Sequence, residues 1–146
     1  LAATGIQKLK IENEVKYFSP ISTDMMIPSM GQATLGIETT NDPRIVELVS
    51  VLNDKDAHIE STIERSFVDT LQGGCQVPIG VKATIIDENS IRVQAIVGMP
   101  DGSESISEDI TANIEEFETI GQTLAQTFLD QGARELLDRA EKLAFK

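Results

Sequence analysis

Apolar residues recur at two spacings along this chain, and the change of spacing separates expected helices from expected strands. A repeat of three or four positions, typical of helices with one buried face, is present in residues 43–52, 55–72, 113–131 and 133–143. Alternation of apolar and polar residues, typical of half-buried strands, covers residues 81–85, 91–97 and, more weakly, 103–110. This order predicts two helices, then three strands, then two helices or one broken helix.

Local signals place the ends of these elements. Asp42 and Pro43 suit the cap and first position of a helix, and Asn113 with Glu116 suits a capping box. Glycines 73–74 suit a helix end, because glycine adopts the left-handed cap conformation readily. Turn residues at 87–90 and 100–102 join the three strands closely, which predicts an antiparallel meander.

The first 40 residues are less regular. Residues 1–10 have a helical texture, a short strand is predicted around Val15, Tyr17 and Phe18, and residues 33–40 are predicted to form a buried strand with Leu35 and Ile37 on one side. A boundary is expected near residues 40–43, because everything after it closes into one α+β unit.

Composition describes a soluble globular protein and limits its partners. The chain has 146 residues, of which 40% are hydrophobic and 25% charged. Its 24 acidic and 12 basic residues give a net charge of −12, which argues against nucleic acid and anionic membrane surfaces as partners. No apolar run approaches the roughly 20 residues that a membrane-spanning helix needs. The single cysteine excludes an internal disulfide and indicates a reducing compartment.

Cys75 is the residue with the most distinctive surroundings. Two glycines precede it and Pro78 follows, so the thiol is expected in a loop between a helix end and a strand, with little side-chain bulk before it and a stiff residue after it. On chemistry alone the favoured interpretation is a small buried hydrophobe, as for most single cysteines. A thiol nucleophile with His58 as its base is the other generic option, but His58 lies several helical turns earlier.

Other chemistry is weakly indicated. The many carboxylates form no acid–base pattern, and no cluster of His, Cys, Asp or Glu has metal-ligand spacing. Gln32 is a polar residue at the start of an otherwise apolar predicted strand, and a hydrogen-bonded strand-end amide explains it as well as a binding role does.

Several segments together resemble one enzyme family. Residues 64–67 (ERSF) and 71–80 (LQGGCQVPIG) resemble the signature of porphobilinogen deaminase, also called hydroxymethylbilane synthase. Residues 1–5 (LAATG) and 28–38 (PSMGQATLGIE) are similar to two more of its segments, and residues 97–102 and 132–134 fit its later hairpin and helix. The resemblance spans essentially the whole chain and covers the C-terminal half of the family.

The resemblance implies a fold and a division into domains. The class is α+β: a C-terminal three-stranded antiparallel sheet packed with helices, preceded by pieces of two α/β lobes that resemble periplasmic binding proteins. Residues 1–25 correspond to the end of domain 2, residues 26–41 to the return segment of domain 1, and residues 42–146 to domain 3, which carries the cofactor.

The resemblance also implies a function for the lone cysteine. Cys75 corresponds to the tether of a dipyrromethane cofactor, bound as a thioether, with Gly74 beside it leaving room for the pyrrole. The tethered dipyrromethane primes the stepwise addition of four porphobilinogens with loss of ammonia, and hydroxymethylbilane is released by hydrolysis. Gln32 and Ala33 correspond to the substrate cleft, and Ala33 replaces the glycine usual in the family.

The family's catalytic aspartate and carboxylate-binding arginines lie in its N-terminal half. No catalytic residue and no metal ligand is therefore assigned in this chain, and the chain alone is expected to be inactive. The expected partners are porphobilinogen and the N-terminal half of the same enzyme, in a cytoplasmic protein that is monomeric at full length. The alternative is a binding or interaction domain of the same ancestry without activity.

Overall fold

The computed structural model describes residues 3–14, 16–72 and 78–144. Three strands form one antiparallel sheet in the order β1-β2-β3: β1 (Ile79–Ile85), β2 (Ser90–Gly98) and β3 (Ser105–Asn113). Val81 pairs with Ala95, and Val93 pairs with Ile110. The predicted meander is confirmed, although its third strand begins two residues later and ends three residues later than expected.

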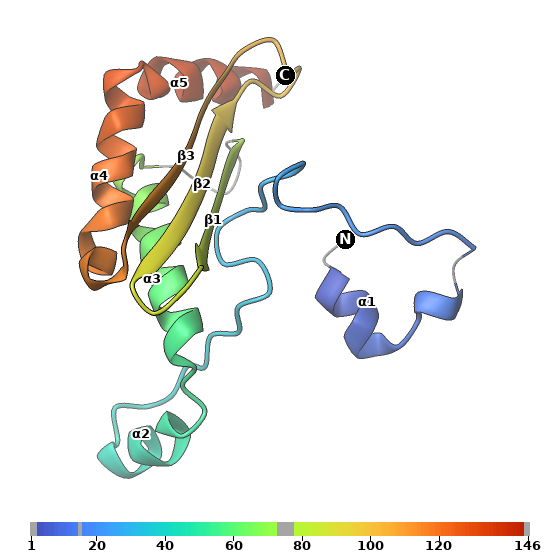
Figure 1. Cartoon of the computed structure of the whole chain (residues 1–146), viewed down its shortest axis with the longest axis vertical. Coiled ribbons are helices and arrows are strands. Elements are labelled where there is room, and N and C mark those ends of the chain that lie inside the picture. Colours follow the sequence, from blue (N-terminus) through green and yellow to red (C-terminus); the bar gives the residue numbers. More distant parts are fainter. Residues whose placement is uncertain (1–2, 15, 73–77, 145–146) are drawn as a thin grey trace.

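Three helices cover the sheet: α3 (Lys55–Thr70), α4 (Phe117–Asp130) and α5 (Ala133–Ala144), as Figure 1 shows. Alternate residues of β1 and β2 point into the same apolar core as the helical stripes, because successive side chains of a strand point to opposite faces. Phe67 of α3 and Phe128 of α4 meet edge to face at its centre, with ring centroids 5.0 Å apart. The α+β class is confirmed.

Helix ends follow the predicted capping chemistry with one correction. Asp42 accepts a hydrogen bond from the Arg44 N–H at the start of α2 (Pro43–Ser50), with Pro43 at the first position. Asn113 accepts from the Glu115 N–H, but it caps a short 3₁₀ turn over Ile114–Glu116, and α4 starts only at Phe117. The predicted capping box is wrong in this respect, because the turn places Glu116 at the start of α4, where its side chain makes no capping hydrogen bond.

The N-terminal part of the chain contributes little to the core. It contains α1 (Ala3–Leu9), a 3₁₀ turn over Glu12–Glu14, and α2, and none of these three elements has a buried residue. Figure 1 shows α1 and α2 standing away from the sheet, joined by a long irregular segment. In the part of the chain that the structure describes, no helix is both long enough and apolar enough to cross a bilayer.

The two strands predicted in this region are wrong. Residues 16–40 contain no strand, and residue 15 lies outside the described residues. Leu35 is 92% exposed and Ile37 is 58% exposed, so the predicted apolar side of the segment covers nothing. A strand exists only when another strand supplies its hydrogen-bond partners, and no described strand lies beside this segment. The apolar pattern of the sequence was therefore not enough to form a strand in this segment.

Candidate functional site

We call residues 71–78, between α3 and β1, the cysteine loop. Cys75 and Gly74 lie outside the described residues, so only the two ends of this loop are described. On one side, the Arg134 guanidinium donates to the Leu71 carbonyl oxygen at 2.7 Å. Gln72, which follows, has a φ of 52°, a left-handed conformation. On the other side, the Gly98 N–H donates to the Pro78 carbonyl oxygen at 3.2 Å. Both ends of the cysteine loop are thus fixed to the packed unit.

Gln32 and Ala33 lie in an exposed turn. The Gln32 N–H donates to the Ser29 carbonyl oxygen at 3.2 Å, and the Thr34 N–H donates to the Gly31 carbonyl oxygen at 2.9 Å. The Ser29 hydroxyl donates to Gln32 Oε1 at 3.1 Å. We call residues 29–34 the Gln32 turn.

Ala33 is strained in this turn. Its φ is 71°, which lies in the left-handed region that costs a residue with a Cβ about 1–2 kcal/mol. Glycine adopts this conformation without the cost.

The segment leading to the Gln32 turn follows the sheet. Asp24 accepts a hydrogen bond from Gln94 Nε2 at 3.1 Å and forms an ion pair with Arg92 at 2.8 Å, both on β2. The Val81 N–H of β1 then donates to the Pro28 carbonyl oxygen at 2.9 Å. A Cβ at Gly80 would lie 2.9 Å from the Ile27 carbonyl oxygen, so glycine is needed for this close approach.

Glu64 connects the Gln32 turn to the packed unit. Its Oε2 accepts from the Gly31 N–H at 2.7 Å, and its Oε1 accepts from the Ala83 N–H at 3.0 Å. Lys82 Nζ lies 3.3 Å from the same Oε1. One buried carboxylate therefore joins α3, β1 and the Gln32 turn.

Three outward-facing amides of β1 are satisfied without another strand. The Val81 N–H uses Pro28, the Ala83 N–H uses Glu64, and the Ile85 N–H donates to Glu60 Oε1 at 3.2 Å. An edge strand with free amides is a template for pairing with another chain. These contacts block that edge.

Lys82 offsets part of the negative charge of the two glutamates. Its ammonium group lies 2.8 Å from Glu60 Oε2 as well as near Glu64. Burial by itself would lower the pKa of Lys82, but hydrogen bonds and Coulomb attraction to Glu60 and Glu64 outweigh it and raise the pKa above its ordinary value. Lys82 therefore stays charged beside the buried Glu64 at neutral pH.

The two predicted site regions are attached to the same helix. The Gln32 turn is bonded to Glu64 in the middle of α3, and the cysteine loop runs from the end of α3 to the start of β1. Glu64 lies seven residues before Leu71, or about 10 Å along the helix axis at 1.5 Å per residue. α3 is thus a common support for both regions.

A thiol nucleophile with His58 as its base gains no support from the structure. His58 is exposed near the start of α3, and its ring faces Phe117 edge-on at 6.3 Å between centroids. Among residues 3–14, 16–72 and 78–144, no group of three His, Cys, Asp or Glu side chains is placed to hold a metal ion.

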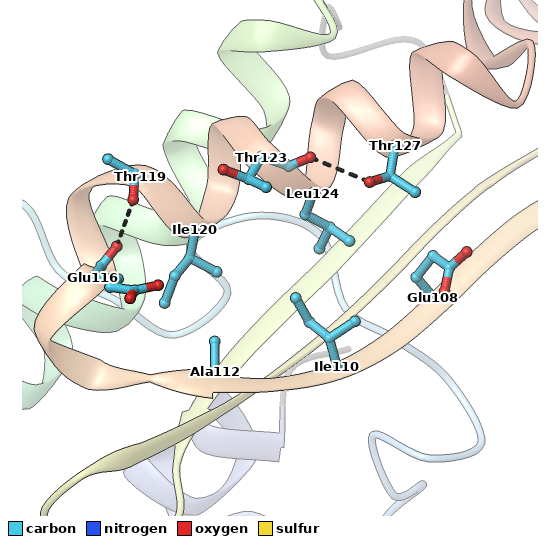
Figure 2. A pocket seen from close by; sticks show the side chains of 9 residues that line it. All are labelled: Glu108, Ile110, Ala112, Glu116, Thr119, Ile120, Thr123, Leu124 and Thr127. Carbon is cyan, nitrogen blue, oxygen red and sulfur yellow. Dashed lines mark hydrogen bonds between the residues drawn. The ribbon is translucent and has the colours of Figure 1, made fainter.

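A cavity of about 180 Å³ lies between α4 and β3 (Figure 2). Its apolar lining comes from Ile110, Ala112, Ile120 and Leu124. Of the threonine hydroxyls that line it, Thr119 donates to the Glu116 carbonyl oxygen just before α4, and Thr127 donates to the Thr123 carbonyl oxygen within α4. It lies on the β3 side of the sheet, whereas both predicted site regions are attached on the β1 side. It belongs to neither region.

Comparison with known proteins identifies the family of this chain. Residues 58–130 match the family model described as porphobilinogen deaminase, C-terminal domain. The chain belongs to the porphobilinogen deaminase family. The resemblance found in the sequence is therefore confirmed, and the matched residues contain most of α3, the cysteine loop, the whole sheet and α4.

Individual relatives extend the match to the whole chain. It is 84% identical over 146 residues to a porphobilinogen deaminase of Aliarcobacter butzleri, covering all of this chain and 47% of that protein. It is 48% identical over 143 residues to the porphobilinogen deaminase of Sulfurimonas denitrificans and 49% identical over 146 residues to that of Nitratiruptor sp., covering 46% of each. The chain spans about half the length of these relatives.

Sequence reasoning missed two residues that organise the site. Glu64 opens the ERSF segment of the family signature but was given no role, and Arg134 was noted only as part of a late motif. One signal was available for Glu64: it directly follows Ile63 of the apolar stripe, so it lies at the edge of the buried face. The bond from Arg134 to Leu71 joins residues 63 positions apart, and no local pattern predicts it.

Proposed function

We propose that this chain is the C-terminal part of a transferase that condenses four porphobilinogens on a cysteine-linked dipyrromethane and releases hydroxymethylbilane in tetrapyrrole biosynthesis. The observation that carries the proposal is the family membership, together with a single cysteine in the GGCQVPIG segment. Relatives named porphobilinogen deaminase match this chain from end to end, the segment included.

In this proposal Cys75 holds the dipyrromethane through a thioether and Gly74 leaves space beside it. The frame around the loop supports the assignment. Leu71 is fully buried and its carbonyl oxygen is held by Arg134, while Pro78 is bonded to Gly98. A covalently attached primer must keep its place while other groups are added to it, and anchored loop ends favour that. The bound group would supply the reactive pyrrole, and the chain would supply its attachment and orientation.

Gln32 and Ala33 are proposed to face the substrate cleft. Both are exposed, and their turn is attached to the unit that carries Cys75. The Gln32 carboxamide can donate to a porphobilinogen carboxylate from Nε2, because its Oε1 already accepts from Ser29.

The remaining parts of the enzyme are proposed to lie in an N-terminal half. Residues 1–25 and 26–41 would complete two lobes that resemble periplasmic binding proteins, and residues 42–146 would form the cofactor-carrying domain. Exposed apolar side chains at Leu35, Leu48 and Leu52 support this, because surfaces of this kind are usually covered by a partner. The net charge of −12 further suggests that the basic groups for the substrate carboxylates lie outside this chain. The full-length enzyme is proposed to be a cytoplasmic monomer.

Intact mass tests the cofactor assignment. Full-length enzyme should be heavier than its sequence by two pyrrole units, and Cys75→Ser should remove both the extra mass and the turnover of porphobilinogen. Ser61→Ala, which removes one exposed hydroxyl from α3, is the control and should keep both. Active full-length enzyme with an unmodified Cys75 would contradict the assignment.

A second measurement separates the enzyme from the alternative of a non-catalytic domain. The 146-residue chain alone should not consume porphobilinogen, and activity should appear only with the N-terminal half present. Turnover by the isolated chain would show that catalytic groups exist within it.

A further inference from the structure

Glu64 is unusual because it is a charged side chain inside the core. Glu64 is 2% exposed, and the buried residues of the same helix include Ile63 and Phe67. Removing a carboxylate from water is costly unless every oxygen is paired. Here both oxygens are used, and one of them reaches Gly31, a residue 33 positions away that belongs to no helix or strand.

Glu60, one turn earlier on α3, is a useful comparison, because it shares every type of contact of Glu64 except the bond to Gly31. Both glutamates pair with Lys82, and each accepts from one outward-facing amide of β1. Stabilising the edge of β1 therefore explains Glu60 completely. It does not explain the second oxygen of Glu64, whose partner is the Gly31 N–H at 2.7 Å.

We infer that Glu64 is a positioning residue that holds the Gln32 turn against the helix carrying the cysteine loop. The consequence for substrate rests on the proposed function: Gln32 and Ala33 would keep a constant position relative to α3, whose C-terminal end leads into the cysteine loop. The bond reaches the turn directly, one residue before Gln32, and α3 extends from this bond to the loop. Glu64 itself contacts no reacting atom.

The geometry requires a carboxylate at this position. Gly31 and Ala83 both present N–H donors, to different oxygens of the same side chain. A glutamine offers one acceptor oxygen and one NH₂ group, so one of the two amides would face another donor. Lys82 and the Ala83 N–H both donate to Oε1, so the glutamine oxygen is expected at that position and its NH₂ group opposite the Gly31 N–H. Glu64→Gln thus changes almost no volume and breaks the bond to Gly31.

Hydrogen exchange in the full-length enzyme tests the contact itself. Glu64→Gln should speed exchange of the amides in residues 29–34 by about tenfold or more, as for loss of a hydrogen bond to a charged group. Glu60→Gln is the matched control, since it also removes a carboxylate from Lys82 and from β1 but does not touch residue 31. Unchanged exchange in Glu64→Gln, or equal acceleration in Glu60→Gln, would overturn the inference.

Kinetics test the consequence for substrate. With cofactor loading verified by mass, Glu64→Gln should raise KM for porphobilinogen by about tenfold, the size expected for one lost charge-assisted hydrogen bond, and change kcat much less. Glu60→Gln should keep the wild-type KM. Faster exchange at residues 29–34 with an unchanged KM would overturn the positioning role, even though the contact is real.

These measurements also separate this inference from the proposed function. If wild-type full-length enzyme carries no extra mass and does not consume porphobilinogen, the proposed function fails, while the exchange experiment still decides whether Glu64 holds the turn. If Glu64→Gln folds poorly because Lys82 loses its buried partner, the neutral pair Glu64→Gln/Lys82→Met replaces it, with Lys82→Met as its control. Exchange at residues 29–34 should then be faster in the double variant than in Lys82→Met.

Discussion

Helices α2 and α3 carry the same kind of apolar stripe, yet only one of them is buried. In α3 and just after it, Ile59, Ile63, Phe67 and Leu71 are at most 6% exposed. Leu48 of α2 and Leu52 just after it are 70% and 65% exposed. The stripe is enough to form each helix, but burial depends on a second surface, and only α3 has one among the described residues, formed by the sheet and α4.

The same difference holds for the two parts of the chain as a whole. Residues 55–144 bury one continuous core, whereas residues 3–52 touch it through a few contacts at Asp24, Ile27, Pro28 and Gly31. Most stability of the chain should therefore reside in the second part. The following predictions test this contrast, beginning with the largest expected effect.

Replacing a leucine by alanine should show the largest difference in stability between the packed part and the open part. Leu124→Ala removes a side chain that is 3% exposed in the core, which should lower the free energy of unfolding by roughly 2–5 kcal/mol. The same change at Leu35, which is 92% exposed, should alter it by less than about 0.5 kcal/mol. Urea denaturation of both variants checks this, and similar losses would contradict the division into a packed part and an open part.

Adding a methyl group should show the same contrast. At Gly121 a Cβ would clash with the Ile63 carbonyl oxygen and lie 2.8 Å from the Phe67 nitrogen, because α3 and α4 cross closely there. Gly121→Ala should therefore cost roughly 1–3 kcal/mol of stability. Gly36→Ala is the matched control, since a Cβ there has no neighbour within 4 Å. If thermal unfolding gives Gly121→Ala the same midpoint as wild type, the helix crossing is wider than described.

In the Gln32 turn, removing a methyl group should increase stability instead of reducing it. Ala33→Gly removes a Cβ from a residue with φ of 71° and should stabilise the turn by about 1 kcal/mol. Gly31→Ala places a Cβ at φ of 68° and should destabilise it by a similar amount. Slower exchange of the Thr34 amide in the first variant and faster exchange in the second are expected. Equal rates would argue against the left-handed conformation at these residues.

The smallest effect concerns Arg92, which pairs with one carboxylate inside the packed part and with one in the open part. Arg92 bonds Asp109 on β3 and pairs with Asp24, and its guanidinium hydrogen bond lowers the pKa of Asp109. A lowered pKa means that this contribution to stability is present above about pH 4, the ordinary value, and is lost as the pH falls through the lower, folded value. Arg92→Gln should weaken that acid dependence, and salt should reduce the difference from wild type. Arg44 likewise lowers the pKa of Asp42, but this pair joins neighbouring residues of the open part, so Arg44→Gln should change the acid dependence of unfolding of the packed part less than Arg92→Gln does.

The elements that could be predicted are those whose signals are local. The stripes of α3 and α4, the alternation in β1 and β2, and the caps at Asp42 and Asn113 are all visible within a few residues. The predicted strand at residues 33–40 failed because alternation shows a preference but not a partner. Of the site, Cys75, Gly74, Gln32 and Ala33 were named through the family signature, whereas Glu64 and Arg134 were not recognised as organising residues.

What the sequence determines by itself is the set of helices and strands from residue 43 onward and the family to which the chain belongs. The helices and strands depend on the backbone preferences and the apolar spacing of residues close together in the chain. The family assignment depends on a signature of consecutive residues. Only the tertiary structure decided which apolar stripes are buried, how the edge of β1 is blocked and which residue holds the Gln32 turn. Those outcomes depend on groups that meet across long stretches of chain, such as the carboxylate of Glu64 and the amide of Gly31.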